Sequence, residues 1–141
     1  MYALKTQAHF DSAHFLHGYD GKCKNIHGHR WTVEAEITGE TLQKDGFQRD
    51  MLIDFGDFKR ELKNLADFYD HSLIYEKNSL KEKTLSALKE EDFRLIEIEC
   101  RPTAENFAKM FFDRLKEKGL NISKVTVYET PENCAVYSNY L

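Results

Sequence analysis

Two long stretches of strictly alternating inward and outward residues constrain this 141-residue chain more than any other feature. The first stretch covers residues 4–14 and the second covers residues 29–40. Their inward series are Leu4, Thr6, Ala8 and Phe10, and then Trp31, Val33, Ala35 and Ile37. A period of two predicts strands with one buried face. The glycine-rich segment 15–28 indicates a loop between them, and we expect the two strands to pair.

Two later stretches carry the three-and-four spacing of amphipathic helices. The first begins after Asp54, whose carboxylate can cap the free N–H groups, and the second runs from a Thr103 cap to Gly119. Their apolar stripes are Phe55, Phe58, Leu62, Leu65, Ala66 and Tyr69, and then Phe107, Phe111, Phe112 and Leu115. Residues 76–92 are highly charged and indicate a weak amphipathic helix or an ordered loop.

Shorter strands complete the pattern. Residues 93–100 alternate as a short strand, and a turn at residues 130–133 joins two apolar segments as a hairpin. The main order is strand, strand, helix, helix, strand, strand. We therefore predict an α+β fold for residues 1–141 as a single domain, with a four-stranded antiparallel sheet and two main helices on one face. Such a sheet has open edges, so we expect the chain to oligomerise.

Composition and charge exclude several classes of function. The net charge of −4 argues against a uniformly basic nucleic-acid binder. No stretch approaches about 18 consecutive apolar residues, so no membrane span is expected. The first residues lack the pattern of a signal peptide, and three cysteines fit free thiols better than a disulfide framework. We therefore expect a cytoplasmic protein.

Three of the six histidines are placed to hold a metal ion. His27 and His29 are two residues apart at the entry of the second strand, so their imidazoles share a face, and Gly28 between them adds no bulk. His14 ends the first strand and can complete the set. Three neutral imidazoles suit Zn²⁺ and leave its fourth position open, which is typical of catalytic sites. The H-G-H tripeptide alone is a weak signal; the added strand position of His14 makes it more specific.

The other candidate groups have alternative interpretations. Cys23, between two lysines and close to the predicted metal, can be a thiolate base, a nucleophile, a fourth ligand or an unused loop residue. Asp70 and His71 can form a proton relay or simply end a helix. Glu129 can grip a planar heterocycle or be solvated at a strand end, and Glu105 can serve only the helix dipole. We expect Cys100 and Cys134 to be small buried residues.

Taken together, six short blocks resemble the 6-pyruvoyltetrahydropterin synthase family. The resemblance is closest to its bacterial branch, the 6-carboxy-5,6,7,8-tetrahydropterin synthases of queuosine (7-deazaguanine) biosynthesis. The blocks are F-D-S-A-H (10–14), C-x3-H-G-H (23–29), D-F (54–55), D-H (70–71), P-T-A-E-N (102–106) and Y-E-T (128–130). The resemblance implies a tunnelling fold (T-fold), with trimers that close a barrel of strands and stack in pairs as a homohexamer.

The resemblance also implies roles for single residues. The zinc ligands would be His14, His27 and His29; the catalytic residues Cys23, Asp70 and His71; and the substrate-binding residues Glu129, Thr103 and Glu105. Glu129 would anchor the pterin ring. The implied reaction converts 7,8-dihydroneopterin triphosphate to 6-carboxy-5,6,7,8-tetrahydropterin with loss of acetaldehyde and triphosphate.

Alternatives to this lyase are a 6-pyruvoyltetrahydropterin synthase and a zinc-dependent pterin-binding protein without turnover. The three-residue gap between Cys23 and His27 favours the carboxy branch. Charge and proximity suggest Lys22, Lys24 and Arg30 as partners of the phosphates. Two departures stand out: Asp11-Ser12 replaces smaller residues, which we expect to touch nothing catalytic, and residues 76–92 are longer than usual and can reshape the pocket mouth.

Overall fold

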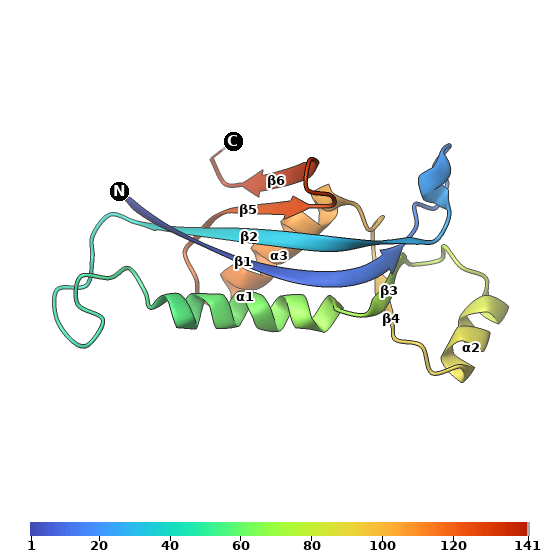
Figure 1. Ribbon diagram of the computed structural model, residues 1–141, viewed down its shortest axis with the longest axis horizontal. Helices are drawn as coiled ribbons and strands as arrows, with labels where there is room; N and C mark the ends of the chain where they lie inside the picture. Colours follow the sequence, from blue (N-terminus) through green and yellow to red (C-terminus); the bar gives the residue numbers. More distant parts are fainter. Residues whose placement is uncertain (141) are drawn as a thin grey trace.

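Two long antiparallel strands form the centre of the fold in a computed structural model that describes residues 1–140 (Figure 1). They are β1 (Tyr2–His14) and β2 (His27–Gly39), and they pair along their whole length, from Tyr2 opposite Gly39 to His14 opposite His27. Their buried positions alternate, as the sequence predicts. The pairing of the two strands is therefore confirmed, with each strand starting about two residues earlier than expected.

Four shorter strands extend this pair into one sheet. On one side lie β5 (Ile122–Tyr128) and β6 (Cys134–Ser138), which form the predicted antiparallel hairpin. On the other side lie β3 (Ser72–Glu76) and β4 (Leu95–Ile98), which run parallel to β1 and to each other. The order is β4-β3-β1-β2-β5-β6. The prediction of a four-stranded antiparallel sheet is thus wrong: the sheet has six strands and is mixed.

The sequence does not reveal β3, and its position explains why. The strand lies between β1 and β4, and Ser72, Ile74 and Tyr75 are buried. A strand buried on both faces reads as a continuous apolar run without the alternation that marks a half-exposed strand. Strand β4 pairs with β3 and lies at an outer edge of the sheet. The short strand expected at 93–100 is therefore part of the same six-stranded sheet.

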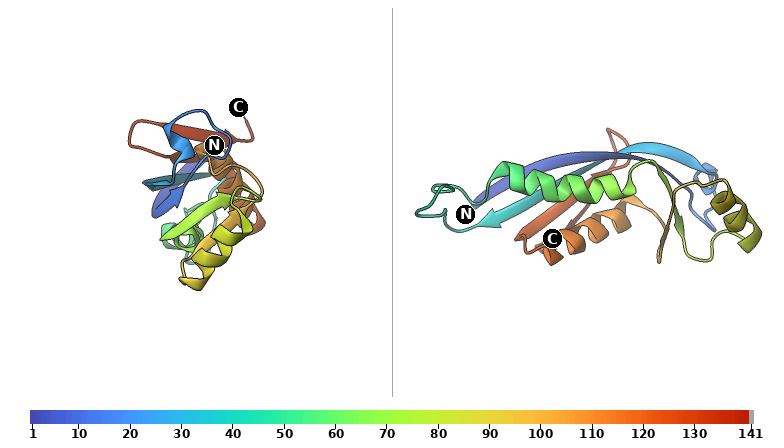
Figure 2. Two further views of the ribbon diagram at one scale, coloured as in Figure 1. Left: turned by 90° about the vertical axis from the view of Figure 1, so that its right-hand side faces the viewer. Right: turned by 90° about the horizontal axis from the view of Figure 1, so that it is seen from below.

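Two helices cover one face of the curled sheet, as expected (Figures 1 and 2). In α1 (Phe55–Tyr69) the Asp54 carboxylate accepts hydrogen bonds from the N–H groups of Gly56 and Asp57. In α3 (Ala104–Glu117) the hydroxyl of Thr103 accepts one from the N–H of Asn106. The charged segment forms a third helix, α2 (Glu82–Glu90), which has no buried residue and lies beyond the end of the sheet near β3 and β4 (Figure 1).

Aromatic side chains fill the space between the sheet and the two helices. Phe10 lies at their centre, and its ring centroid is 5.8–5.9 Å from the rings of Trp31, Tyr69, Phe107 and Phe111. Burial of each such side chain stabilises the fold by roughly 1.5–3 kcal/mol. The core therefore fixes the last residues of β1 and the first residues of β2 against the start of α3. The three histidines lie in this region.

Two residues expected in the core lie outside it. Phe55, in the first turn of α1, is 59% exposed. Cys134 is exposed on the edge strand β6, so its interpretation as a buried residue is wrong, whereas Cys100 is half-buried against the core. Within residues 1–140, every helix is too short or too polar to cross a bilayer.

Candidate functional site

The structure brings together the three histidines that the sequence pattern singles out. His14 is the last residue of β1 and pairs with His27, the first residue of β2. His29 lies two residues further along β2, so its side chain leaves the sheet on the same face. The three rings have centroids 4.5–5.1 Å apart, and one nitrogen from each lies within 4.8 Å of the others. This arrangement is described below as the histidine cluster.

Two rings of the histidine cluster are held in the tautomer that a metal ligand needs. Nδ1 of His14 lies 2.7 Å from the carbonyl oxygen of Pro102, and Nδ1 of His27 lies 2.7 Å from that of Asn25. A carbonyl can only accept, so both Nδ1 atoms donate, and both Nε2 atoms carry lone pairs in the neutral rings. These Nε2 atoms are 3.0 Å apart. Two lone pairs at this distance repel each other unless a cation lies between them.

The third ring leaves a buried nitrogen without a hydrogen bond. Nε2 of His29 is buried and makes none within residues 1–140, although it lies 3.2 Å from Oε1 of Glu129. Burial lowers the pKa of His29, and it lowers the pKa of His14 to about 4 against the opposing hydrogen bond to Pro102. Both rings are therefore neutral near pH 7. Neutral, preoriented imidazoles with an unpartnered nitrogen fit Zn²⁺, which binds such ligands through three protein groups.

Cys23 lies outside the histidine cluster. It is half-buried in a short 3₁₀ turn, η1 (Lys22–Lys24), and its carbonyl accepts a hydrogen bond of 2.9 Å from the N–H of Leu16. That bond ties the turn to the end of β1. Within residues 1–140, no hydrogen bond joins the thiol to the histidines or to Asp70. The structure thus places Cys23 near the entry to β2 without joining it to another candidate group.

Asp70 and His71 form a pair that is fixed to β1. Oδ2 of Asp70 lies 2.7 Å from Nδ1 of His71, and Oδ1 accepts a 2.8 Å hydrogen bond from the N–H of Asp11. The N–H of His71 in turn donates to the carbonyl of Asp11. The hydrogen bond from Asp11, aided by His71, lowers the pKa of Asp70. Asp11 was expected to touch nothing catalytic, and the structure shows that its backbone N–H and carbonyl contact this candidate pair.

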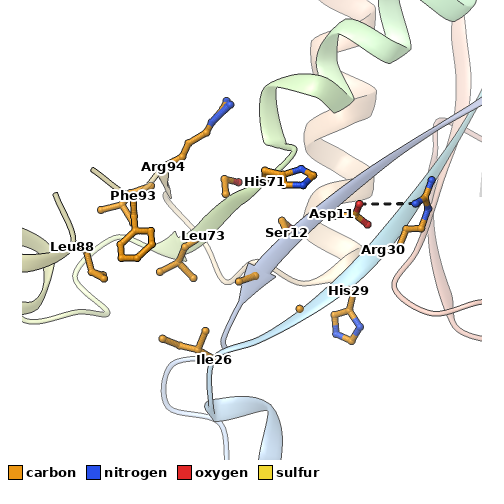
Figure 3. A pocket seen from close by; sticks show the side chains of 14 residues that line it. Asp11, Ser12, Ile26, His29, Arg30, His71, Leu73, Leu88, Phe93 and Arg94 are labelled. Carbon is orange, nitrogen blue, oxygen red and sulfur yellow. Dashed lines mark ion pairs between the residues drawn. The ribbon is translucent and has the colours of Figure 1, made fainter. Parts of the chain in front are cut away.

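A cavity of about 700 Å³ adjoins His71 (Figure 3). Its polar side includes Asp11, Arg30 and His29, and Arg30 lies 4.0 Å from the Asp11 carboxylate. Its apolar side includes Ile26, Leu73, Leu88 and Phe93, which point into a common space in Figure 3. Leu88 belongs to α2, so the segment 76–92 contributes one residue to the lining of this cavity, and Phe93 follows directly after the segment.

A second cavity of about 620 Å³ contains Glu129. It is lined by His9, Thr32, Tyr128 and Glu129, and it shares Gly28, His29 and Arg30 with the cavity beside His71. His29 and Arg30 therefore border both spaces. Thr103 and Glu105 line neither of these two cavities: Thr103 caps α3, and Glu105 is exposed in its first turn.

Three contributors to the site escape the sequence analysis. The first is the carbonyl of Pro102, a backbone group that leaves no signal in the pattern. The second is Trp31, whose ring packs edge-on against His14 and His29 at centroid distances of 5.0 and 5.4 Å. Its position two residues after His29 on the same face was a usable signal. The third is the N–H of Asp11, which only the tertiary contact with Asp70 reveals.

Comparisons with known proteins identify the family of this chain. A family model described as 6-pyruvoyl tetrahydropterin synthase matches residues 3–140. A Haemophilus influenzae protein named 6-carboxy-5,6,7,8-tetrahydropterin synthase is 36% identical over 140 residues, which cover 97% of this chain and 99% of the relative. An Aquifex aeolicus protein of the same name is 35% identical over 126 residues, covering 82% and 75% of the two chains.

Solved structures share the same fold. The 6-pyruvoyl tetrahydropterin synthase of Caenorhabditis elegans superimposes with a TM-score of 0.70 and 25% identity, covering 98% of this chain and 95% of that one. The Plasmodium falciparum enzyme of the same name superimposes with a TM-score of 0.68 at 19% identity and covers 99% of both chains. The latter likeness concerns the fold alone.

Proposed function

The chain belongs to the 6-pyruvoyl tetrahydropterin synthase family, and on this premise we propose that it is a zinc-dependent lyase. The proposed reaction converts 7,8-dihydroneopterin triphosphate to 6-carboxy-5,6,7,8-tetrahydropterin, with release of acetaldehyde and triphosphate, for queuosine (7-deazaguanine) biosynthesis. The observation that carries the proposal is the histidine cluster, with two Nε2 lone pairs 3.0 Å apart. The names of the curated relatives support the carboxy product over the pyruvoyl product.

In this proposal His14, His27 and His29 hold zinc, and the fourth position is left for substrate. When bound, zinc supplies Lewis-acid polarisation of the hydroxyl groups on the substrate side chain. Cys23 removes a proton from the carbon next to the pterin ring as a thiolate. A base that removes this proton must not itself be a metal ligand and must be accessible to the substrate. The half-buried position of Cys23 in the turn before β2, outside the histidine cluster, supports this role.

Asp70 and His71 return or relay protons in the proposed mechanism. The carboxylate accepts a hydrogen bond from Nδ1–H of His71, so Nε2 of the neutral ring carries a lone pair. The hydrogen bond from Asp11 lowers the pKa of Asp70, so the carboxylate, which is ionised at neutral pH in any case, remains an acceptor to lower pH. His71 is 79% exposed at its side chain and lines the larger cavity, so protons can enter and leave the ring.

Glu129 anchors the pterin ring in this proposal. Its carboxylate is half-buried, lies within the smaller cavity and is close to His29, so a ring held there places its side chain beside the histidine cluster. Arg30, which borders both cavities, is the best placed of the expected phosphate partners, whereas Lys22 and Lys24 border neither. Thr103 and Glu105 remain proposed contributors to the pterin pocket on the strength of the resemblance alone.

We further propose that the protein works as a homohexamer, a dimer of trimers. Strand β3 pairs with β1 only at Ser12 and Ala13, so the preceding residues of β1 form an open edge, and β6 forms another. Open strands of this length invite pairing with another chain. The His71 cavity and the Glu129 cavity are distinct within one chain, although both are bordered by Gly28, His29 and Arg30. Native mass spectrometry should give a mass near six times 16.6 kDa, and a monomer would contradict the assembly.

The decisive experiment is a product assay. The zinc-loaded protein is incubated with 7,8-dihydroneopterin triphosphate, and the products are separated by chromatography with acetaldehyde measured in parallel. Acetaldehyde together with 6-carboxytetrahydropterin supports the proposed lyase. Formation of 6-pyruvoyltetrahydropterin would instead identify the pyruvoyl synthase alternative. Unchanged substrate that is nevertheless bound would identify a pterin-binding protein without turnover.

A further inference from the structure

The most buried ring of the histidine cluster depends on a backbone group far along the chain. His14 is 1% exposed, and its Nδ1–H donates to the carbonyl of Pro102, 88 residues away in sequence. That carbonyl lies in the connection between β4 and α3, outside any strand or helix. The connection passes the end of β1 in Figure 1. Regular secondary structure therefore does not fix the acceptor, and another element has to hold it.

Hydrogen bonds from α3 hold this connection on both sides of Pro102. The carbonyl of Arg101 accepts from the side-chain Nδ2 of Asn106 at 2.9 Å and from the N–H of Thr103 at 2.8 Å. The hydroxyl of Thr103 accepts from the N–H of Asn106 at 3.3 Å. Proline itself has no N–H to contribute and has a fixed φ. The orientation of the Pro102 carbonyl is thus set by its neighbours, and Asn106 contacts both of them.

We propose that Asn106 is a positioning residue for the metal centre, which holds the 101–103 turn so that the Pro102 carbonyl fixes the tautomer and direction of His14. The inference rests on the proposed metal site and adds a residue to which the reasoning from sequence gave no role. Metal-binding histidines commonly donate their second N–H to a backbone carbonyl or carboxylate, and loss of such partners typically weakens metal binding by roughly 10- to 100-fold.

A purely structural role for Asn106 makes a different prediction. In that case its replacement would lower stability and leave zinc binding unchanged. Asn121 provides the matched control, because its Nδ2 also donates to a backbone carbonyl, that of Thr38, at 2.7 Å. This contact lies where β2 ends, and the histidine cluster lies where β2 begins. Asn121→Ala therefore removes the same type of hydrogen bond without touching the cluster.

The test compares Asn106→Ala, Asn106→Asp and Asn121→Ala with the unchanged protein. Aspartate keeps the shape of the side chain but replaces the donor that faces the Arg101 carbonyl with an acceptor. Zinc affinity is measured by competition with a chromogenic chelator, and melting temperatures are recorded for the metal-free proteins. We expect both Asn106 variants to bind zinc roughly 10- to 100-fold more weakly, and Asn121→Ala to bind as tightly as the unchanged protein.

A second readout does not depend on the metal. In the metal-free protein, ¹⁵N NMR of the imidazoles should show His14 with its proton on Nδ1, and Asn106→Ala should show a mixture of the two tautomers. An unchanged zinc affinity or an unchanged His14 tautomer in Asn106→Ala would overturn the inference, as would an equal loss of affinity in Asn121→Ala. If the unchanged protein binds no zinc, the proposed function fails, and the tautomer measurement still decides the role of Asn106.

Discussion

Replacement of Asp70 by asparagine separates the charge of this side chain from its shape. In the structure, Oδ1 accepts from the N–H of Asp11 at 2.8 Å, and Oδ2 accepts from Nδ1 of His71 at 2.7 Å. The asparagine oxygen can keep the first hydrogen bond. The new NH₂ group then faces Nδ1–H, and two donors cannot bond. His71 must therefore move its proton to Nε2 or turn away from residue 70.

The expected size of the effect follows from this geometry. Loss of a positioned acid–base group typically costs about 10² to 10⁴ in kcat, and the corresponding Asp→Asn change in serine proteases costs about 10⁴ by reversing the tautomer of histidine. His71 is 79% exposed, so water can satisfy a reoriented ring. We therefore expect the lower end, about 10², which corresponds to about 2.7 kcal/mol in the activation free energy. The retained bond to Asp11 should keep the loss of unfolding free energy near 1 kcal/mol.

The dependence of stability on pH provides an independent check. Because the hydrogen bond from Asp11 lowers the pKa of Asp70, its carboxylate stabilises the folded state above the ordinary value of 3.8. That contribution is lost as the pH falls through the lowered folded-state pKa. The difference in unfolding free energy between the unchanged protein and Asp70→Asn should thus shrink as the pH falls into the acid range. Urea unfolding at several pH values measures it.

Asp67→Asn is the matched control for these measurements. Asp67 lies on α1 in an exposed ion pair with Lys63 at 2.7 Å, away from His71. We expect this variant to keep full activity and to lose less than about 1 kcal/mol of stability. The reasoning would be refuted by an Asp70→Asn protein that is folded and fully active. It would equally be refuted if Asp67→Asn lost as much activity.

Three further predictions concern the metal, the base and the sheet. Cys23→Ala should bind zinc normally but lose turnover in the product assay, and loss of zinc would show that Cys23 is a ligand. His27→Ala should retain no zinc by atomic absorption, and a full zinc content in this variant would count against the histidine cluster. In the unchanged protein, zinc at 100 times its Kd should raise the free energy of unfolding by about 2.7 kcal/mol. Glu36→Ala should lose about 2 kcal/mol in urea unfolding, because the buried Glu36 accepts from Ser123 at 2.8 Å and lies 3.4 Å from Lys124. Unchanged stability would indicate that this buried group contributes nothing.

Much of the fold was predictable because its signals are local. Alternation identifies β1 and β2, whose outer faces are polar, and the caps Asp54 and Thr103 mark the starts of α1 and α3. Two of the three clustered histidines follow from the same logic, since a spacing of two on a strand fixes a shared face. The place of His14 beside the other two histidines could be predicted once the two strands were expected to pair.

Elements determined by their neighbours were not predictable. Strand β3 is buried between two strands, so its sequence lacks alternation, and its parallel pairing with β1 joins residues about sixty positions apart. Cys134 is a different case: it lies on the face of β6 opposite Ala135 and Tyr137, which pack against the core, so its exposure follows from alternation along the strand. The roles of Asp11 and Pro102 come from their backbone groups. Any residue except proline has a backbone N–H, and every residue has a backbone carbonyl, so the residue type gives no signal.

The sequence by itself therefore determined which side chains are candidates for chemistry and which faces of the long strands they share. The tertiary structure decided how those groups are oriented. It placed the Pro102 carbonyl against His14, the Asp11 N–H against Asp70, and Glu129 in a cavity separate from that of His71. The physical reason is that residue type and period set local conformation, whereas the tautomer of an imidazole and the charge of a carboxylate depend on hydrogen bonds from distant segments.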